Sequence, residues 1–571
     1  MTKLQFRVLY RQFLFRMVDL ELLSASAQGD ISKLLGQFAG LLVFFSFACS
    51  FGSLIFDRGK LSPPKLQSAL WGMEHFFIST TLLVVGLFSV LSWDSTFPDR
   101  RDVLVLAPLP IRARTLFLAK ITAAASALSL TVVAMHCFAG LGWPFHFIPK
   151  GGNALRSLAA YWITMFAAGA FNFCCVLGVQ GLAAQLLPRR YFLRLSAFLQ
   201  MAAFCWFVSS YLLEPSIVTP SAFAAPQNQR ALEWLPSYWF LGFLNQLNGS
   251  MHPAFTALTR RAWIGLAVAF SGTAVAYALS YFRTLKKIVE EPDIVAGSGG
   301  VHWLPGFGNS LETGVVQFSI RTLARSRQHR VMLAFFLGLG FALLVFVLKN
   351  PGPKDASLRA ELPLLFTTVA VMCITVVGTR VVFSMPISLR ANWIFRVTQV
   401  SSVREYMAAI RRPLFVLGVA PVWIVSAALL FSMWPWQLAA DHLVVLGLLG
   451  AIVAYVCLAA FRKIPFTCSY LPGKSYLHMA FMTAMFLMLF IVRGVVLESQ
   501  ALQNSTLYAI MVAVLAVAAL AARWWAVSRA NEEDAVVQFE EVQAPILQTL
   551  GLNRDGVVTT EAASAHNSHA C

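Results

Sequence analysis

Residues 442–460 read HLVVLGLLGAIVAYVCLAA, a run that contains no Lys, Arg, Asp or Glu. An α-helix needs about 20 such residues to cross the roughly 30 Å hydrocarbon core of a membrane. Comparable apolar stretches recur at residues 35–56, 70–93, 117–141, 158–186, 195–213, 262–282, 331–348, 362–383, 414–434, 476–495 and 507–525. The sequence therefore predicts an all-α polytopic membrane protein with about twelve transmembrane helices.

The composition of the whole chain agrees with this class. Of its 571 residues, 58% are hydrophobic and only 12% are charged, and the mean hydropathy is +0.69. Soluble globular domains carry about 25% charged residues, so the chain lies outside that class. Most of the nine cysteines fall within apolar stretches and none falls in a predicted outer loop. We therefore expect no disulfide framework.

Two sequence motifs occur once in each half of the chain. Residues 110–120 (PIRARTLFLAK) and 386–396 (PISLRANWIFR) both fit the pattern P-I-x-x-R-x-x-[aromatic]-x-x-[basic]. Further along, residues 187–194 (LPRRYFLR) and 471–478 (LPGKSYLH) form a second pair. The offsets between copies are about 276 and 284 residues, which indicates one duplicated unit. We expect two pseudo-symmetric six-helix halves, at residues 34–282 and 312–528, with basic elements on one side of the membrane, as in a transporter driven from that side.

The segments outside the predicted spans also have distinct compositions. Residues 1–33 and the start of the 312–528 half are each expected to hold a cytoplasmic amphipathic helix. A glycine-rich cytoplasmic linker is predicted at 283–311, and a flexible acidic cytoplasmic tail at 529–571. The outer loop at 214–261 is rich in aromatic residues, so it is expected to form interfacial helices that cap the outer mouth.

Lys and Arg set the predicted orientation. The chain has 44 of them against 26 Asp and Glu, a formal net charge of +18. With the N-terminus inside, the cytoplasmic segments hold about 30 and the outer loops about 11, the asymmetry of the positive-inside rule. We therefore expect a multi-pass protein of the cytoplasmic (inner) membrane with both termini cytoplasmic, whose excess charge contacts anionic lipids. No basic soluble module is visible, so nucleic acid is not an expected partner.

Few ionisable residues fall inside the predicted spans. Glu74 and His75 lie in the second stretch and His136 in the third, and all three are candidates for a substrate pathway. Glu74 is expected about one turn from the outer end of its span, where water and headgroups reach it. An interfacial position is therefore preferred over a proton shuttle with His75. The two histidines lack partners at metal-ligand spacing in the sequence, and no metal site is predicted.

The motifs and the order of the helices resemble the membrane subunits of ABC-2 type exporters. The resemblance rests on the leading amphipathic helix, on six spans per half, and on residues 102–120 with their weaker copy at 383–396. In that family the helix between spans two and three docks on a separate ATPase. By this resemblance the coupling residues are Pro110, Arg112, Arg114, Phe117 and Lys120, and Pro386, Arg390, Trp393 and Arg396 in the second copy. This chain departs from many family members because it fuses two six-span units.

The resemblance implies a permease without enzymatic activity, which exports a hydrophobic or amphiphilic substrate while partner ATPase subunits at the cytoplasmic face hydrolyse ATP. The sequence offers no nucleotide site of its own. Residues 473–475 (GKS) end like a phosphate-binding loop, but Cys468 stands where the first glycine is required. The chain itself is therefore expected to bind no cofactor.

Two other functions stay open. A twelve-span secondary transporter would share the architecture, but residues 97–102 (FPDRRD) lack the glycines of the major-facilitator loop motif. A polytopic membrane enzyme acting on lipids would place paired carboxylates or a His pair at one depth of the membrane. No H-E-x-x-H or paired acidic motif occurs within a span, so this alternative has less support.

Overall fold

The structure, a computed structural model, describes residues 3–18, 31–56, 61–96, 103, 106, 109–149, 152–214, 217–250, 252–290, 305–349, 362–385, 403–458, 464–467 and 477–530. The regular elements in these ranges are all helices. Eight of them are long and apolar enough to cross a membrane, or nine when one bent pair is counted as a single span. The predicted all-α, multi-pass class is confirmed.

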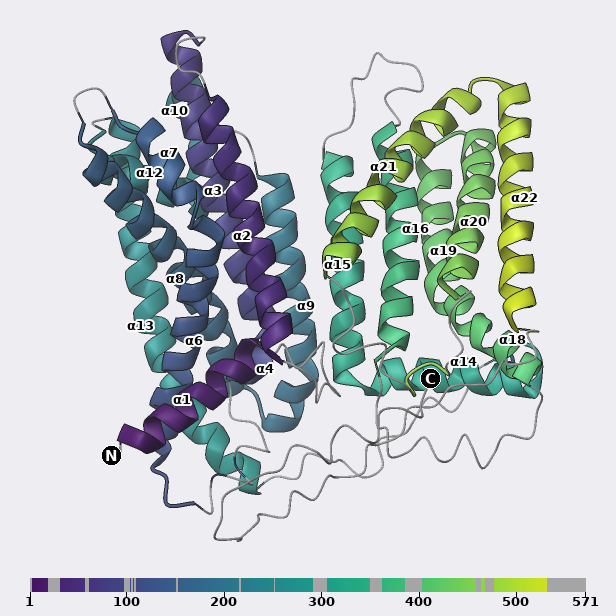
Figure 1. The fold of residues 1–571 in the computed structure, drawn as a ribbon, viewed down its shortest axis with the longest axis horizontal. Helices are drawn as coiled ribbons and strands as arrows, with labels where there is room; N and C mark the ends of the chain where they lie inside the picture. Colours follow the sequence, from purple (N-terminus) through teal and green to yellow (C-terminus); the bar gives the residue numbers. More distant parts are fainter. Residues whose placement is uncertain are drawn as a thin grey trace, which may run out of the picture.

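The helices of the chain form two bundles that stand side by side, and the first half of the chain makes up one of them (Figure 1). Its elements are α1 (Lys3–Val18), α2 (Ile31–Ile55), α3 (Pro63–Leu91), α4 (Trp93–Thr96), α6 (Ala113–His136), α7 (Ala139–His146), α8 (Ala154–Leu186), α9 (Arg189–Leu213), α10 (Pro220–Ala224), η2 (Pro226–Asn228), α11 (Gln229–Trp234), α12 (Pro236–Asn248) and α13 (Pro253–Glu290).

The second bundle contains the rest of the described chain (Figure 1). Its elements are α14 (Ser310–Arg325), α15 (Arg327–Lys349), α16 (Leu362–Phe383), α18 (Val403–Leu414), the π-helix η5 (Phe415–Val419), α19 (Ala420–Met433), α20 (Trp436–Leu458), α21 (Leu477–Ala501) and α22 (Ser505–Ala530). Each of the twelve apolar stretches overlaps a helix of this or the first bundle, while the number of true spans stays a prediction.

Several predicted boundaries differ from those of the structure, and the difference is largest for the sixth stretch. The sixth stretch was expected at 262–282, but α13 runs from Pro253 to Glu290, so the first residues of the expected linker are helical. The helix extends because no proline or glycine follows the apolar stretch before residue 290. The middle of the linker and the tail beyond residue 530 lie outside the described residues.

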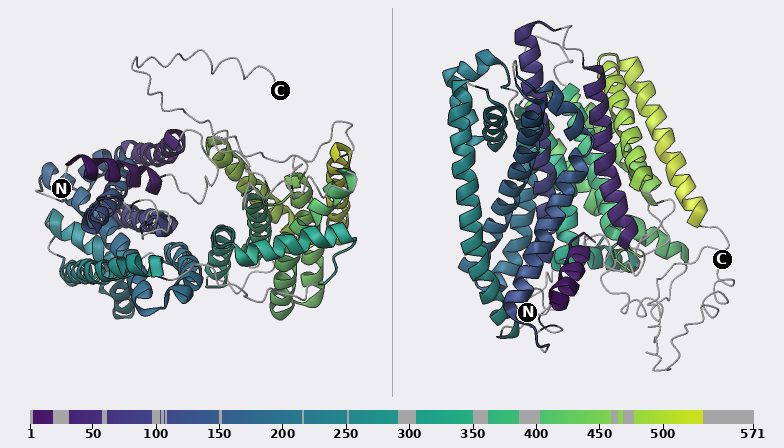
Figure 2. Two further views of the ribbon diagram at one scale, coloured as in Figure 1. Left: turned by 90° about the horizontal axis from the view of Figure 1, so that it is seen from below. Right: turned by 60° about the vertical axis from the view of Figure 1, so that its left-hand side comes forward.

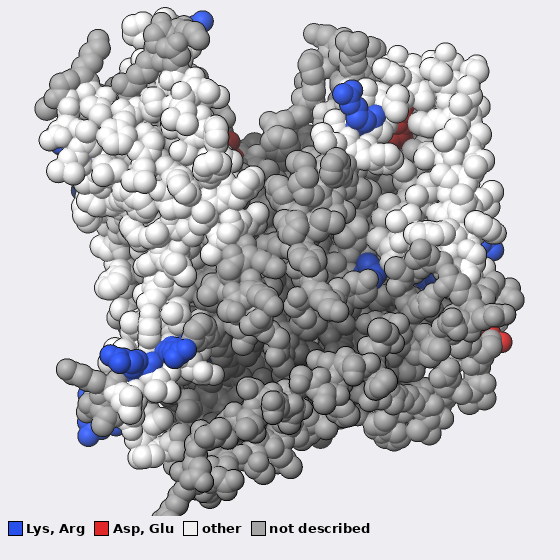
Figure 3. Space-filling model, viewed as in Figure 1, with Lys and Arg blue, Asp and Glu red and all other residues white. Residues whose placement is uncertain are grey.

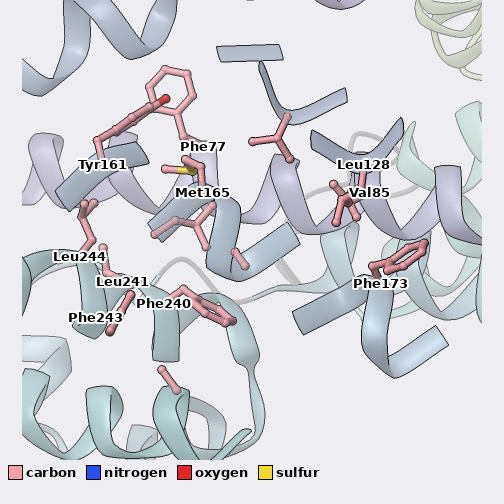
Figure 4. Packing of buried hydrophobic residues seen from close by; sticks show 14 of the residues in the cluster. Phe77, Val85, Leu128, Tyr161, Met165, Phe173, Phe240, Leu241, Phe243 and Leu244 are labelled. Atoms are coloured by element: carbon pink, nitrogen blue, oxygen red, sulfur yellow. The ribbon is translucent and has the colours of Figure 1, made fainter. Parts of the chain in front are cut away.

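The core of the first half is built around α8, which begins where the Asn153 side chain caps the Leu155 amide at 3.0 Å. This helix packs against α3, α12 and α13. Tyr161 and Met165 of α8 meet Phe77 of α3 in a cluster of fully buried side chains (Figure 4). Such burial in a membrane bundle depends on close packing of side chains more than on exclusion of water.

Helices are present in the loop that was expected to form interfacial helices, and they also contribute to this core. On α12, a row of four residues is at most 2% exposed: Phe240, Leu241, Phe243 and Leu244 (Figure 4). Between them, Gly242 allows close approach to α13, because a Cβ there would lie 2.6 Å from Leu258 Cβ. One face of α12 is thus covered by protein, while a position of these helices at the membrane interface stays a prediction.

In the second half, α16 has the central position and packs against α15, α20 and α21. The third helix of this half is irregular. It starts as α18, passes through the π-helical turn η5 and continues as α19, with Pro413 near the end of α18. Proline removes a helical hydrogen bond, and π-turns occur where a helix carries an extra residue.

Two amphipathic helices lie across the same end of the two bundles, α1 under the first and α14 under the second (Figures 1 and 2). On α1, Arg7 and Arg11 are exposed while Leu9 and Phe13 are buried. A bend of 88° separates Ser310–Arg325 from the span that follows. Both predicted amphipathic helices are therefore present, and basic side chains gather at the α1 end of the first bundle (Figure 3).

The two bundles touch along specific helices. The fifth helix of the first half, α9, packs along α15, the first long helix of the second half. In this contact the rings of Phe204 and Phe335 meet edge to face with centroids 4.3 Å apart. On the other side α2 touches α21.

Candidate functional site

The helix α3 carries a row of polar residues within a candidate membrane span. Glu74, His75, Ser79 and Thr81 all lie in its first two thirds. His75 and Ser79 are four residues apart and share one face, while Glu74 and Thr81 are seven apart and share the neighbouring face. Polar groups at such positions need partners from other helices, because hydrocarbon offers none.

Glu74 meets its partner on α12. Its side chain is only 3% exposed, and Asn245 Nδ2 donates to Glu74 Oε2 at 2.6 Å. The preferred interpretation, that water and headgroups reach this carboxyl, is therefore wrong. The covering helix lies about 170 positions away in the sequence, so nothing local to Glu74 could reveal it.

His75 and Ser79 both contact Glu214, the residue that follows the last turn of α9. His75 Nε2 lies 3.2 Å from Glu214 Oε1, and Ser79 Oγ donates to Glu214 Oε2 at 2.8 Å. The His75 ring lies over Tyr238 of α12, with ring centroids 4.5 Å apart. Burial raises the pKa of Tyr238, so its hydroxyl stays neutral and accepts from the Ile217 amide at 2.9 Å.

His136 is completely buried between α3 and α8. Thr81 Oγ1 donates to the Phe77 carbonyl at 2.6 Å, so it can only accept from His136 Nε2, which is 2.9 Å away. The other ring nitrogen, Nδ1, lies 2.8 Å from the Tyr161 hydroxyl and accepts from it. Both nitrogens of a neutral imidazole are thus satisfied, which makes His136 a structural link between three helices.

The second half contains a related cluster that the sequence analysis did not predict. Thr368 Oγ1 donates to the Leu365 carbonyl at 2.9 Å and accepts from His442 Nε2 at 2.8 Å. His442 Nδ1 lies 2.6 Å from Glu498 Oε1, and the two side chains are 0% and 2% exposed. One proton between Nδ1 and Oε1 completes this cluster, either as an ion pair or as a neutral imidazole that accepts from a carboxylic acid.

The spacing of the duplicated motifs contains a signal for this cluster. Tyr161 and His442, on the fourth long helix of each half, are 281 positions apart, and Glu214 and Glu498 are 284 apart. Thr81 and Thr368, on the second long helix, are 287 apart. These separations match the offsets of about 276 and 284 between the motif copies. At an offset of 284 residues, Glu498 aligns with Glu214 in the amino-acid sequence.

The first predicted coupling motif divides into exposed and buried residues. Pro110, Arg112 and Arg114 are exposed at the start of α6, where Arg112 is the N-cap residue. Phe117 is half-buried and packs against Tyr281 of α13, with ring centroids 4.9 Å apart. Lys120 is only 2% exposed, and its Nζ lies 5.2 Å above the Phe13 ring of α1. Lys120 is therefore buried against α1, and its role in coupling stays a prediction.

The second copy of the motif is not placed by the structure. Pro386, Arg390, Trp393 and Arg396 lie outside the described residues, and so does the pair at 471–476. Among the residues that the structure describes, no group of three or more His, Cys, Asp or Glu side chains could hold a metal ion.

Comparison with known proteins identifies no relative. No protein-family model, no curated protein and no solved structure matches this chain.

Proposed function

We propose that this chain is the membrane-spanning permease of an ABC-type transport system, in which a separate ATPase powers export of a hydrophobic or amphiphilic substrate. Its twelve predicted spans would form two six-helix halves related by a pseudo-two-fold axis along the membrane normal. In this proposal the amphipathic helices and the starts of the third helices form the surface on which the ATPase acts.

The observation that carries the proposal is a repeated contact at one end of the molecule. In the first half α1 packs on α6, where Tyr10 Oη donates to Ser126 Oγ at 3.0 Å. In the second half α14 packs on α18, where Arg412 Nε lies 3.3 Å from Glu312 Oε2. Each of the two amphipathic helices, α1 and α14, thus contacts the third long helix of its own half. A push on this end would therefore move the third helix, as coupling to a partner requires.

The contacts between the bundles support the two-half arrangement. The fifth long helix of each half meets the first long helix of the other, α9 with α15 and α21 with α2. An isologous interface pairs elements in this reciprocal way, because a two-fold axis exchanges its two sides. Within the first half the second long helix, α3, packs on the fourth and the fifth, and α16 does the same in the second half.

Association with an ATPase is the direct test. The triple change Arg112→Ala, Arg114→Ala and Arg390→Ala removes charges from the two motif copies, while Arg230→Ala with Arg260→Ala removes exposed charges from α11 and α13. We expect the triple variant to keep its detergent melting temperature but to lose copurification of the ATPase and transport. The control should keep all three. Transport at the full rate without any bound ATPase contradicts the proposal.

One observation favours a secondary transporter as the second candidate. Two carboxyl groups, those of Glu74 and Glu498, are buried within long apolar helices. Buried carboxyls beside histidine are the groups that proton-driven carriers use. Transport that follows a proton gradient and needs no ATPase would support this candidate.

A further inference from the structure

A cavity of about 530 Å³ lies among α3, α8 and α9, and the segment from α11 to α12 closes one end of it. This volume falls within the roughly 300–1,000 Å³ of typical ligand pockets. Along α9 its wall extends from Leu199 to Glu214, which at 1.5 Å per residue is a length of about 22 Å. The cavity is therefore long enough for an extended hydrocarbon chain.

The wall of the cavity is apolar over most of this length. It includes the side chains of Leu82, Phe171, Val176, Val179, Ala203 and Phe207. Among the described residues that line it, none is a lysine, an arginine or a histidine. An anionic headgroup would consequently find no positive partner on this wall.

Polar groups gather at the end closed by α11 and α12. Glu214 is the one carboxylate among the described lining residues, and Ser79, Tyr211 and Ser237 lie at the same end. The Glu214 carboxylate accepts a hydrogen bond from the Ser79 hydroxyl and contacts His75. Each of its oxygens has a further lone pair. It can accept an additional donor from a molecule in the cavity.

Ser237 lies at the same polar end of the cavity. It is only 2% exposed, and its Oγ has no hydrogen-bond partner in the described structure. Buried hydroxyls are nearly always paired, because an unpaired one loses its bonds to water without replacement. Because its Oγ is shielded from the cavity as well as from solvent, a molecule in the cavity reaches Glu214 and not this hydroxyl.

We propose that this cavity binds an amphiphile with one apolar tail and an ammonium headgroup. The tail lies between α3, α8 and α9, and the ammonium donates to Glu214 beside the rings of Tyr211 and Trp234. The proposal rests on the export function above and names its substrate class. Binding itself needs neither ATPase nor transport, so the two proposals can fail separately.

Binding to the full-length chain in nanodiscs of zwitterionic lipid tests the proposal. The probe is an alkylammonium with a brominated dodecyl chain, detected by quenching of tryptophan fluorescence, and the comparison probes are the alcohol and the sulfate of the same chain. We expect the ammonium to bind at least ten-fold more tightly than the other two. Equal or tighter binding of the sulfate overturns the proposal.

Matched variants locate the site. Glu214→Gln should weaken binding of the ammonium at least ten-fold and leave binding of the alcohol unchanged, while Ser237→Ala should change neither, because its hydroxyl is shielded from the cavity. Ala202→Trp, which fills the apolar part, should abolish binding of both. Glu233→Gln makes the same charge change at an exposed residue paired with Arg261 and should have no effect. Equal ammonium affinity in the Glu214→Gln and Glu233→Gln proteins overturns the proposal.

Discussion

His442 Nδ1 lies 2.6 Å from Glu498 Oε1, and both side chains are shielded from solvent between α20 and α21. Because Nε2 of the same ring already donates to Thr368, only one proton can occupy the short contact with Glu498. The pair is therefore neutral overall in either of its two forms, which is what a low-dielectric environment favours.

Loss of the Glu498 side chain should destabilise the second bundle. In Glu498→Ala the His442 Nδ1 is buried without a partner, at a cost of about 1–3 kcal/mol. Glu498→Gln should recover most of this loss, because an amide can donate to Nδ1. Melting of the purified protein in detergent measures the difference, with Glu233→Ala as an exposed control. Equal melting of the Ala and Gln variants would show that the contact contributes nothing.

Exchange of Glu74 for glutamine distinguishes the two candidate functions. Glu74→Gln keeps a hydrogen-bonding partner for Asn245 but removes the titratable group. If the chain is an ATP-driven permease, transport should stay close to the wild-type rate, because Glu74 then only links α3 to α12. Transport assays in proteoliposomes with and without a proton gradient give the answer. A severe loss of transport with normal folding would point to proton coupling instead.

Substitution of the buried and of the exposed basic residues of the first motif should lower the stability of the protein by different amounts. Lys120→Ala removes a buried cation held over Phe13, and we expect a loss of about 1–2 kcal/mol. Arg114→Ala changes an exposed side chain, for which the cost is usually below about 0.5 kcal/mol. Detergent melting of the two single variants, measured side by side, checks this order. The reverse order would contradict the structure.

Because α12 packs closely on α13, a larger side chain at Gly242 should destabilise the first bundle. In Gly242→Ala the new methyl group would meet Leu258 Cβ at 2.6 Å and the Phe255 carbonyl oxygen at 3.0 Å, so α12 must shift. Overpacking of this kind costs about 1–3 kcal/mol. Gly272→Ala, on α13, meets nothing within 4 Å and should be neutral or slightly stabilising. The pair of melting temperatures decides whether α12 is an integral part of the bundle.

Reporter fusions test the predicted orientation. The distribution of Lys and Arg requires both termini and the residues just before α6 to be cytoplasmic, with the segment from α10 to α12 on the opposite side. Fusions after residue 112, after residue 228 and at the C-terminus should report inside, outside and inside. An external C-terminus together with a cytoplasmic residue 112 would require an odd number of spans and exclude the twelve-span arrangement.

The helices were predictable from the sequence because their signal is local. Each apolar stretch overlaps a helix, and the stripes of α1 and α14 follow from the spacing of Arg7 and Arg11 or of Arg321 and Arg325. The partners of the polar residues depend on tertiary contacts. Asn245 reaches Glu74 from a distant loop helix, and Phe13 turns Lys120 from a surface charge into a buried one. The hydropathy of the sequence does not predict contacts between residues that are far apart in the chain.

The π-turn η5 gives the second bundle a property that the first lacks in its corresponding helix α6. A π-turn holds one residue more than an α-helical turn. Its conversion to α-helical geometry would advance α18 by about 1.5 Å and rotate it by about 100° relative to α19. Since the ion pair between Glu312 and Arg412 links α18 to α14, α14 would move together with α18. The two halves would then respond differently to the same displacement at this end of the molecule. The third helix of the first half would move as a rigid rod, whereas that of the second half could change its length and rotation by one residue at η5.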